Sequence, residues 1–301
     1  MTRLSLLICA VVLVACGLHP PAVVANTAAC GKAVSSGMHK ASMSSGVLER
    51  SYQVYVPKRW SNQVPRPLVL GLHGGYGSGA EFNAQTSASA RADKFNMLLV
   101  LPDGYYKSWN AGECCKPAAK LGVRDVRFIE NLIDKVSQDY CVDRSSVFAT
   151  GFSNGAMLAH RIACEKPGLL KAIAPVAGGI MSECKNGGAV AALLIGGKED
   201  PRIFWNGGTF DGSYRPSMQE LVQNLSGRNQ CSRQEKALNS STSVVQCHEL
   251  AACGKQPLRY CGVEGVGHQW PGGKTYWPKK LGQNTQAFDA TEEIFNFFSR
   301  L

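Results

Sequence analysis

Short apolar runs recur along the chain between residues 47 and 200, and polar segments long enough to form helices separate them. A continuous run of apolar residues that ends at glycine, proline or aspartate is typical of a strand buried on both faces. Residues 51–56 instead alternate between polar and apolar side chains, which predicts a strand that ends at Pro57. The continuous runs predict further strands at 67–72, 97–101, 146–150, 172–177 and 190–195.

Three segments carry apolar residues at helical spacing. The first begins near Asp125 and extends to Val136, the second covers 154–165, and the last begins at about Asp289. Strands that alternate with helices form βαβ units, and such units build a mostly parallel sheet covered by helices on both faces. The pattern therefore predicts an α/β fold.

Two other segments lack this regularity. Residues 27–46 are rich in alanine, serine and glycine, and we expect them to be a loosely held N-terminal segment. The cysteine-rich stretch 227–262 has few apolar runs, which predicts a disulfide-stapled excursion from the main fold. Because no linker, repeat or low-complexity segment divides the chain, we expect residues 27–301 to form one domain.

The first residues resemble an export signal. Arg3 precedes an apolar run, 4–15, that is too short to span a membrane comfortably. We expect a signal peptide, residues 1–25, that is removed from a secreted protein. The alternative is a lipoprotein signal, residues 1–15, after which Cys16 would carry a lipid anchor to the cell envelope. Both alternatives place the protein outside the cytoplasm, without a transmembrane span.

Cysteine usage agrees with export. Of the 12 cysteines, Cys9 and Cys16 lie in the leader, and the other ten are enough for up to five disulfides. We expect the adjacent Cys114 and Cys115 to reach two different partners, because a bridge between neighbours is strained. No Cys-x-x-Cys motif or nearby histidine pair supports a metal site. The remaining cysteines are Cys30, Cys141, Cys164, Cys184, Cys231, Cys247, Cys253 and Cys261.

The charge of the chain excludes one class of partner. The formal net charge is +10, but the basic residues are scattered, and Lys279-Lys280 is the one tight pair late in the chain. A nucleic-acid-binding surface needs a basic patch. We therefore expect no nucleic-acid partner, and interpret the charge as general surface character, suited to an acidic wall or polysaccharide surface.

A Gly-x-Ser-x-Gly motif, residues 151–155, lies between a predicted strand and a predicted helix. Nucleophilic catalysis by serine needs the hydroxyl on a tight turn, and small residues two positions away on either side let strand and helix approach closely. The amides at the start of the helix also favour negative charge. The motif in this context predicts that Ser153 is a nucleophile.

A serine nucleophile needs a general base, which in this chain order follows the serine. Of the six histidines, only His268 lies on a glycine-rich loop after a predicted strand and before the last helix. His160 lies on the helix after Ser153 and points along it, His248 lies between cysteines, and His73 fits a loop that binds an oxyanion. His268 is therefore the expected base.

The acid that orients this base should follow a strand between the two. Asp200, after the strand at 190–195, is the expected residue, with Glu199 as its rival. A developing oxyanion needs at least two N–H donors. We expect the amide of Asn154 and an amide of the loop after the strand at 67–72, with Gly75 favoured over Gly74 and Tyr76.

With these residues identified, the chain resembles the α/β-hydrolase esterases that include polyhydroxybutyrate depolymerases and feruloyl and acetylxylan esterases. The resemblance runs from about residue 30 to the C-terminus and is carried by 72–75, 102–104, 108–110, 140–143, 151–155, 174–178 and 267–272. It implies the triad Ser153, Asp200 and His268. It also implies that Trp109 and Trp270 border the substrate pocket, with burial in an aromatic core as the alternative.

The chain departs from the family at two positions. Arg124 stands where an acid is usual, and Gln269 replaces the more usual threonine after the base. Neither change removes a catalytic group, but both bear on which substrate is preferred.

The sequence thus predicts a secreted serine esterase that forms an acyl-enzyme and needs no metal or organic cofactor. Its expected substrates are feruloyl or acetyl esters on polysaccharide, or hydroxybutyrate oligomers. The alternatives are a surface-attached carbohydrate-binding protein that retains the hydrolase fold without catalysis, and a peptidase or thioesterase that uses the same triad.

Overall fold

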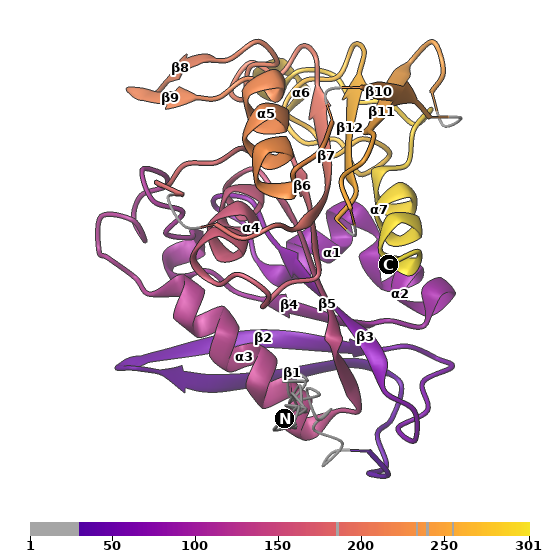
Figure 1. Ribbon diagram of the computed structural model, residues 1–301. Coiled ribbons are helices and arrows are strands. Elements are labelled where there is room, and N and C mark those ends of the chain that lie inside the picture. The colour runs from indigo at the N-terminus through magenta and orange to yellow at the C-terminus, as the bar shows by residue number, and fades with distance from the viewer. Residues whose placement is uncertain (1–29, 185–186, 233, 239–240, 255) are drawn as a thin grey trace, which may run out of the picture.

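The computed structural model describes residues 30–184, 187–232, 234–238, 241–254 and 256–301. Within these residues, ten strands form one sheet in the order β1-β2-β4-β3-β5-β6-β7-β12-β11-β10 (Figure 1). The strands from β4 to β12 are parallel to one another, and both edges of the sheet are antiparallel. Their bounds are β1 (Gly37–Ser45), β2 (Leu48–Val56), β3 (Arg66–Leu72), β4 (Leu98–Pro102), β5 (Val142–Phe152), β6 (Ala172–Val176), β7 (Ala191–Gly197), β10 (Glu235–Ala237), β11 (Val245–Leu250) and β12 (Leu258–Val263).

Helices cover both faces of this sheet, as the alternating pattern predicts (Figure 1). One face carries α1 (Gly79–Thr86), α2 (Ala88–Phe95) and α7 (Ala290–Ser299), and the other carries α3 (Asp125–Asp139), α4 (Asn154–Glu165) and α5 (Met218–Asn229). The shorter elements are a 3-10 turn η1 (Tyr105–Lys107), the hairpin of β8 (Gly208–Phe210) and β9 (Ser213–Arg215), and α6 (Pro278–Leu281).

The central strands are apolar throughout because each contributes side chains to two hydrophobic cores, one on each face of the sheet. In β3, Leu68 and Leu70 pack on the side of α3 and α4, whereas Val69 packs on the side of α1 and α7. All three side chains are fully buried. Successive side chains of a strand point to opposite faces, so a strand between two helical layers needs an apolar residue at every position. This confirms the predicted buried strands, whose ends shift by only a few residues.

The structure corrects the expectation of a loose N-terminal segment, 27–46, over residues 37–45, whereas residues 27–29 lie outside the part of the chain that it describes. Residues 37–45 form β1, which pairs antiparallel with β2 along its whole length. Its side chains are largely exposed, so the strand carries little apolar signal. The ladder of backbone hydrogen bonds with β2 therefore defines it, and side-chain patterning does not reveal such pairing.

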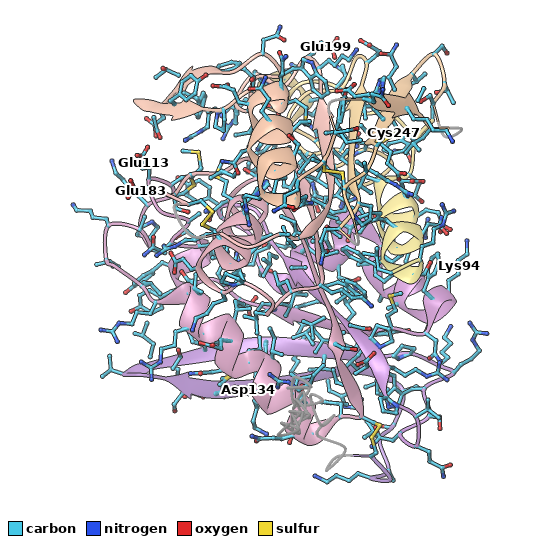
Figure 2. All side chains as sticks on the ribbon, viewed as in Figure 1. Lys94, Glu113, Asp134, Glu183, Glu199 and Cys247 are labelled. Atoms are coloured by element: carbon cyan, nitrogen blue, oxygen red, sulfur yellow. A yellow bond between two sulfur atoms is a disulfide. The ribbon has the colours of Figure 1, made fainter. Side chains whose placement is uncertain are left out.

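The cysteine-rich stretch 227–262 is likewise more regular than expected. It contributes β10, β11 and β12 to the main sheet, with β12 parallel to β7. The disulfide Cys247–Cys261 joins two residues that face each other across β11 and β12, and Cys247 is labelled in Figure 2. A second disulfide, Cys231–Cys253, closes the same region. The disulfides within this stretch are as predicted. The stretch nevertheless extends the main sheet, and the expectation of an excursion from the fold is wrong.

The expectation for Cys114 and Cys115 is wrong. The two cysteines are joined to each other, across a cis peptide bond that leaves their Cα atoms 3.1 Å apart. The other bridges are Cys30–Cys141 and Cys164–Cys184. Since the eight remaining cysteines outside the leader pair among themselves, none is left as a separate partner for either neighbour.

Helices α1, α2 and α5 were not predicted from the apolar pattern. Helix α5 nevertheless carries a recognisable start signal, because Ser217 and Glu220 form a reciprocal capping box. The expected leader, including Cys16, lies outside the described residues. Over the part of the chain that the structure describes, the helices are too short or too polar to cross a membrane.

Buried His160 gives the fold a testable dependence on pH. The side chain is 1% exposed within α4, and burial lowers the pKa of its imidazole to about 3, with Arg228 adding to the shift. The unfolded chain would bind a proton at His160 below pH 6.5, whereas the folded chain would not until about pH 3. Stability is therefore lost as the pH falls through this window, by about 1.4 kcal/mol per pH unit.

We predict that His160→Leu reduces the loss of unfolding free energy between pH 7 and pH 5 by about 2 kcal/mol, whatever its effect at pH 7. Denaturant titrations at the two pH values measure this difference. His39→Gln, on the exposed strand β1, is the control and should keep the wild-type dependence. Identical pH dependence in His160→Leu and wild type would contradict the assignment.

Candidate active site

Ser153 lies on the sharp turn between β5 and α4. Its backbone has φ 53° and ψ −115°, a conformation that L-residues rarely adopt, and its N–H donates to the carbonyl of Val176 on β6 at 3.0 Å. The side chain is half-buried and stands at the carboxyl edge of the parallel strands. This is the strand–turn–helix context that the motif predicts.

The two glycines of the motif make this turn possible. A Cβ at Gly151 would collide with the backbone of Gly155 and Ala156, and a Cβ at Gly155 would collide with the carbonyls of Leu72 and His73. Strand β5, the start of α4 and the end of β3 therefore approach more closely than side chains would allow. The serine hydroxyl is raised out of the sheet as a result.

The predicted base contacts this hydroxyl, 115 residues away in the chain, and the predicted acid contacts the base, 68 residues away. Ser153 Oγ lies 2.9 Å from His268 Nε2, and His268 Nδ1 lies 2.8 Å from Asp200 Oδ2. His268 follows β12, and Asp200 follows β7. Because β5, β7 and β12 are parallel, their carboxyl ends bring all three residues to one edge of the sheet.

Asp200 is built to hold the imidazole in one orientation. Its side chain is buried, and its second oxygen, Oδ1, accepts backbone N–H bonds from Arg202 at 2.7 Å and Ile203 at 2.8 Å. A carboxylate facing Nδ1 requires the proton on that nitrogen, which leaves Nε2 free to accept the serine proton. The rings of Phe152 and His268, with centroids 4.9 Å apart, pack against each other on one side.

Glu199, the rival acid, is placed differently. Its backbone N–H donates to the carbonyl of Val266, but its side chain is exposed, and it is Asp200 that bonds the imidazole. Figure 2 shows it at the upper edge of the molecule, pointing outward. The geometry therefore brings Asp200, and not Glu199, together with His268.

Two backbone regions flank Ser153 as candidate oxyanion donors. Asn154 is the first residue of α4, where amide groups have no intrahelical acceptor. In the loop after β3, the N–H of Tyr76 already donates to Lys107 at 2.7 Å. Gly75 is exposed, and its N–H has no acceptor within the described part of the chain. These contacts support Gly75 over Tyr76.

His73 shapes this loop without serving as a base. Its Nδ1 donates to the carbonyl of Gly74 at 2.7 Å, and its Nε2 accepts the N–H of Gly104 at 2.8 Å. Burial lowers the pKa of His73, which keeps the imidazole neutral and able to make both bonds. The loop is thereby fixed against the segment that follows β4.

Trp109 connects the two candidate donors. The side-chain amide of Asn154 accepts from the N–H of Trp109 at 2.7 Å and donates to its carbonyl at 2.9 Å. The indole Nε1 of Trp109 donates to the carbonyl of His73 at 2.9 Å. One buried residue therefore holds both the start of α4 and the loop that carries Gly75.

A buried ion pair anchors Trp109 in turn. Arg50 Nη2 lies 2.8 Å from Asp125 Oδ1, and Asp125 Oδ2 accepts the N–H of Asn110 at 2.7 Å. Burial raises the pKa of Asp125, while Arg50 opposes the shift. The guanidinium also lies 3.9 Å from the ring centre of Phe128. Sequence reasoning missed Arg50 and Asp125, because their pairing depends on a contact 75 residues apart.

The expectation that Trp109 and Trp270 border a pocket is corrected in favour of an aromatic core. Both side chains are fully buried. Trp270 donates from Nε1 to Thr291 Oγ1 at 2.9 Å and packs edge-on against Phe82 and Phe152. Each indole satisfies its polar group inside the protein, so neither faces solvent.

Gln269, the other unusual residue, supports the loop of the base. Its buried amide donates to the carbonyls of Tyr276 and Gly282 at 2.7 and 2.9 Å, and its Oε1 accepts the N–H of Tyr276 at 3.1 Å. Three hydrogen bonds thus tie residues 276–282 to the position next to His268.

Comparisons with known proteins agree with this geometry. Residues 50–224 match the family model described as "Esterase PHB depolymerase". The chain is 29% identical over 283 residues to "Probable feruloyl esterase C" of Aspergillus niger, covering 90% of this chain and 91% of that protein. It is 30% identical over 207 residues to "Feruloyl esterase C" of Emericella nidulans, covering 65% and 70%. The match to the Aspergillus oryzae relative spans 66% of that protein, slightly less than two thirds.

Solved structures agree on the fold. An acetyl xylan esterase from Aspergillus awamori superposes with a TM-score of 0.61 at 16% identity, covering 87% of this chain and 100% of that one. An S-formylglutathione hydrolase from Agrobacterium tumefaciens gives 0.56 at 14% identity, covering 87% and 94%. The chain therefore belongs to the family described as "Esterase PHB depolymerase", and it has the α/β-hydrolase fold.

Proposed function

We propose that the protein is an exported serine esterase that cleaves acyl groups from polysaccharide, with Ser153 as nucleophile, His268 as general base and Asp200 as the orienting acid. The observation that carries this proposal is the continuous hydrogen-bonded chain from Asp200 through His268 to Ser153, at a turn that exposes the hydroxyl. Relatives named feruloyl esterase support plant-wall esters as substrates. Hydroxybutyrate oligomers remain the second candidate, supported by the family model.

The reaction proceeds by two acyl transfers. His268 Nε2 takes the proton of Ser153 as the serine oxygen attacks the ester carbonyl, and Asp200 stabilises the imidazolium that forms. The imidazolium then protonates the leaving alcohol, and an acyl-enzyme remains. Water, deprotonated by the same imidazole, attacks the acyl-enzyme and releases the acid and the free serine. These steps call for no metal or organic cofactor.

The oxyanion of each tetrahedral intermediate is stabilised by the amides of Asn154 and Gly75. Charge on this oxygen develops only as the carbonyl is attacked, so donors held in place beforehand lower the barrier. Trp109 supports this arrangement, because it is bonded both to Asn154 and to the loop that carries Gly75.

Export fits the chemistry of the folded domain. Five disulfides join described cysteines, and such bridges persist in oxidising compartments. We propose that a signal peptide, residues 1–25, directs secretion, with lipidation at Cys16 as the alternative. The intact mass of the mature protein distinguishes the two.

Substitutions of the neighbouring acids Asp200 and Glu199 test the assignment of the triad acid directly. We predict that Asp200→Asn lowers kcat for p-nitrophenyl acetate about 10⁴-fold, because the imidazole loses its correct tautomer. Glu199→Gln is the matched control and should retain near wild-type kcat, since this side chain points away from the site. The reverse ranking of the two variants in steady-state kinetics would show that the triad acid is misassigned.

Substitution of Trp109 tests whether this residue positions the two oxyanion donors. Trp109→Phe keeps most of the buried ring but removes the bond from Nε1 to the His73 carbonyl. We predict a fall in kcat of roughly tenfold with little change in KM, since a small misplacement of a donor weakens transition-state binding. Trp60→Phe, which also loses an indole hydrogen bond but lies between β2 and β3, is the control. Equal kcat values for the two variants would argue against a positioning role.

A substrate panel tests the class of ester. We expect faster hydrolysis of methyl ferulate or acetylated xylan than of hydroxybutyrate oligomers, and no cleavage of matched peptide amides. Release of ferulate, acetate or hydroxybutyrate is measured at equal enzyme concentration. Hydrolysis of the oligomers alone would move the assignment to polyester, and cleavage of amides would favour a peptidase.

A further inference from the structure

A groove of about 660 Å³ lies at the tip of the β1–β2 hairpin, apart from the triad. The hairpin, the segment 121–124 and the first turns of α3 form its walls, and Tyr105 of η1 contributes one side. Helix α3 contacts β1 and crosses β1 and β2 diagonally in the lower half of Figure 1. None of the groups that carry out the proposed acyl transfer lines this groove.

The groove nevertheless opens at the same edge of the sheet as the active site. Strand β2 runs antiparallel to β4, and Tyr52 near its start pairs with Pro102 at the carboxyl end of β4. The hairpin tip therefore lies at the carboxyl edge, where Ser153 follows β5. Strands β5, β3, β4 and β2 are successive neighbours. At ~4.8 Å per strand, β2 lies about 14 Å from the strand that carries the nucleophile.

One segment connects the groove with the catalytic loop. Tyr105 lines the groove, while Lys107, two residues later, accepts the N–H of Tyr76 at 2.7 Å. Gly104 donates to His73 on the same loop. The groove is thus adjacent to the oxyanion loop but too far away to hold the group attached directly to the scissile ester. The separation of the groove from Ser153 would let it bind another unit of a polymeric substrate whose ester group lies at the serine.

The lining of the groove carries uncompensated positive charge. Arg124 and Arg127 are exposed and have no carboxylate partner within the described part of the chain. Arg50 also reaches the lining, but it is paired with Asp125. No aspartate or glutamate is among the lining residues, which are Ser45, Gly46, Val47, Leu48, Arg50, Tyr105, Leu121, Gly122, Val123, Arg124, Arg127 and Asn131.

The other walls suit a sugar. Val47 is 100% exposed and Leu121 is 58% exposed, and such apolar surfaces can cover the CH face of a pyranose ring. The hydroxyl of Ser45 and the amide of Asn131 can hydrogen-bond sugar hydroxyls. A planar guanidinium binds a carboxylate through two parallel hydrogen bonds. A single inorganic anion would leave most of this volume unused.

We propose that this groove binds a carboxylate-bearing sugar unit of the same polysaccharide that carries the ester, with Arg124 and Arg127 contacting the carboxylate. The proposal rests on the proposed function in one respect, that the substrate is a polysaccharide ester. It assigns a role to Arg124, one of the two positions at which the sequence departs from the expected family pattern. The enzyme would accordingly prefer ester groups next to an acidic branch of the polymer.

The test compares acetylated xylo-oligosaccharides that carry a uronic acid branch with oligosaccharides of the same length that lack it. In the Arg124→Gln/Arg127→Gln variant, we expect KM for the acidic oligosaccharide to rise about tenfold, because exposed ion pairs contribute modestly. The kcat values, and KM for the neutral oligosaccharide and p-nitrophenyl acetate, should stay at wild-type levels. High salt should raise the wild-type KM for the acidic oligosaccharide alone.

Lys236→Gln/Arg300→Gln is the matched control, since it removes the same charge from β10 at the opposite edge of the sheet and from the C-terminal end. It should keep the wild-type KM for the acidic oligosaccharide. An equal rise of KM in both double variants would reveal a general charge effect and overturn the proposal. So would an equal rise of KM for acidic and neutral oligosaccharides in the groove variant, which indicates a neutral-sugar site.

Direct binding separates this proposal from the proposed function. Unesterified uronic-acid-bearing and neutral xylo-oligosaccharides are titrated into wild-type protein and both double variants by calorimetry. Tighter binding of the acidic oligosaccharide, lost only in the groove variant, supports the site even if no xylan ester is hydrolysed. Equal affinity of wild-type protein for the two oligosaccharides would overturn the site, even if esters are cleaved.

Discussion

The backbone turn at Ser153 is the constraint on which the rest of the site depends. Its φ of 53° lies in a region that costs a non-glycine residue about 1–3 kcal/mol, and surrounding contacts must hold it there. The N–H bond to Val176 provides one such contact, and the close approach of Gly151 and Gly155 provides another. As a result, the hydroxyl projects from the sheet within reach of His268. The amide of Asn154, the first residue of α4, lies next to it in the chain.

The rest of the active site can be understood as support for this turn. Asp200 fixes the imidazole, and Gln269 fixes the loop that delivers it. On the other side, Trp109 joins the start of α4 to the loop after β3, and the buried pair of Arg50 and Asp125 holds the segment that carries Trp109. Removing either charge would leave the other buried without a partner, so this support is sensitive to single changes.

Sequence alone predicts much of this arrangement, because local signals are strong where the chain is buried or sharply turned. Continuous apolar runs identify the central strands, and a Gly-x-Ser-x-Gly motif between strand and helix identifies the turn. The signals fail where pairing is long-range: β1 has little apolar pattern, and the disulfide partner of Cys114 is not encoded in spacing. The sequence favours Asp200 over Glu199 but leaves both open, and the direction of their side chains in the structure separates them.

Trp109 illustrates a different limit of prediction from sequence. Family resemblance implies a role near the substrate, but the indole is fully buried and acts on the site through hydrogen bonds to Asn154 and His73. The groove at the β1–β2 hairpin was also beyond sequence reasoning, since its walls come from segments about 80 residues apart. Both features arise from tertiary contacts, which local patterns do not record.

The identity of the acylated residue is the most direct test of the central claim. Native protein is treated with a fluorophosphonate, digested, and the modified peptide is sequenced by mass spectrometry. A stoichiometric adduct on Ser153, absent when His268 is replaced by alanine, is the result that the geometry of the turn predicts. An adduct on a different serine, or full esterase activity in protein that carries the adduct on Ser153, would contradict it.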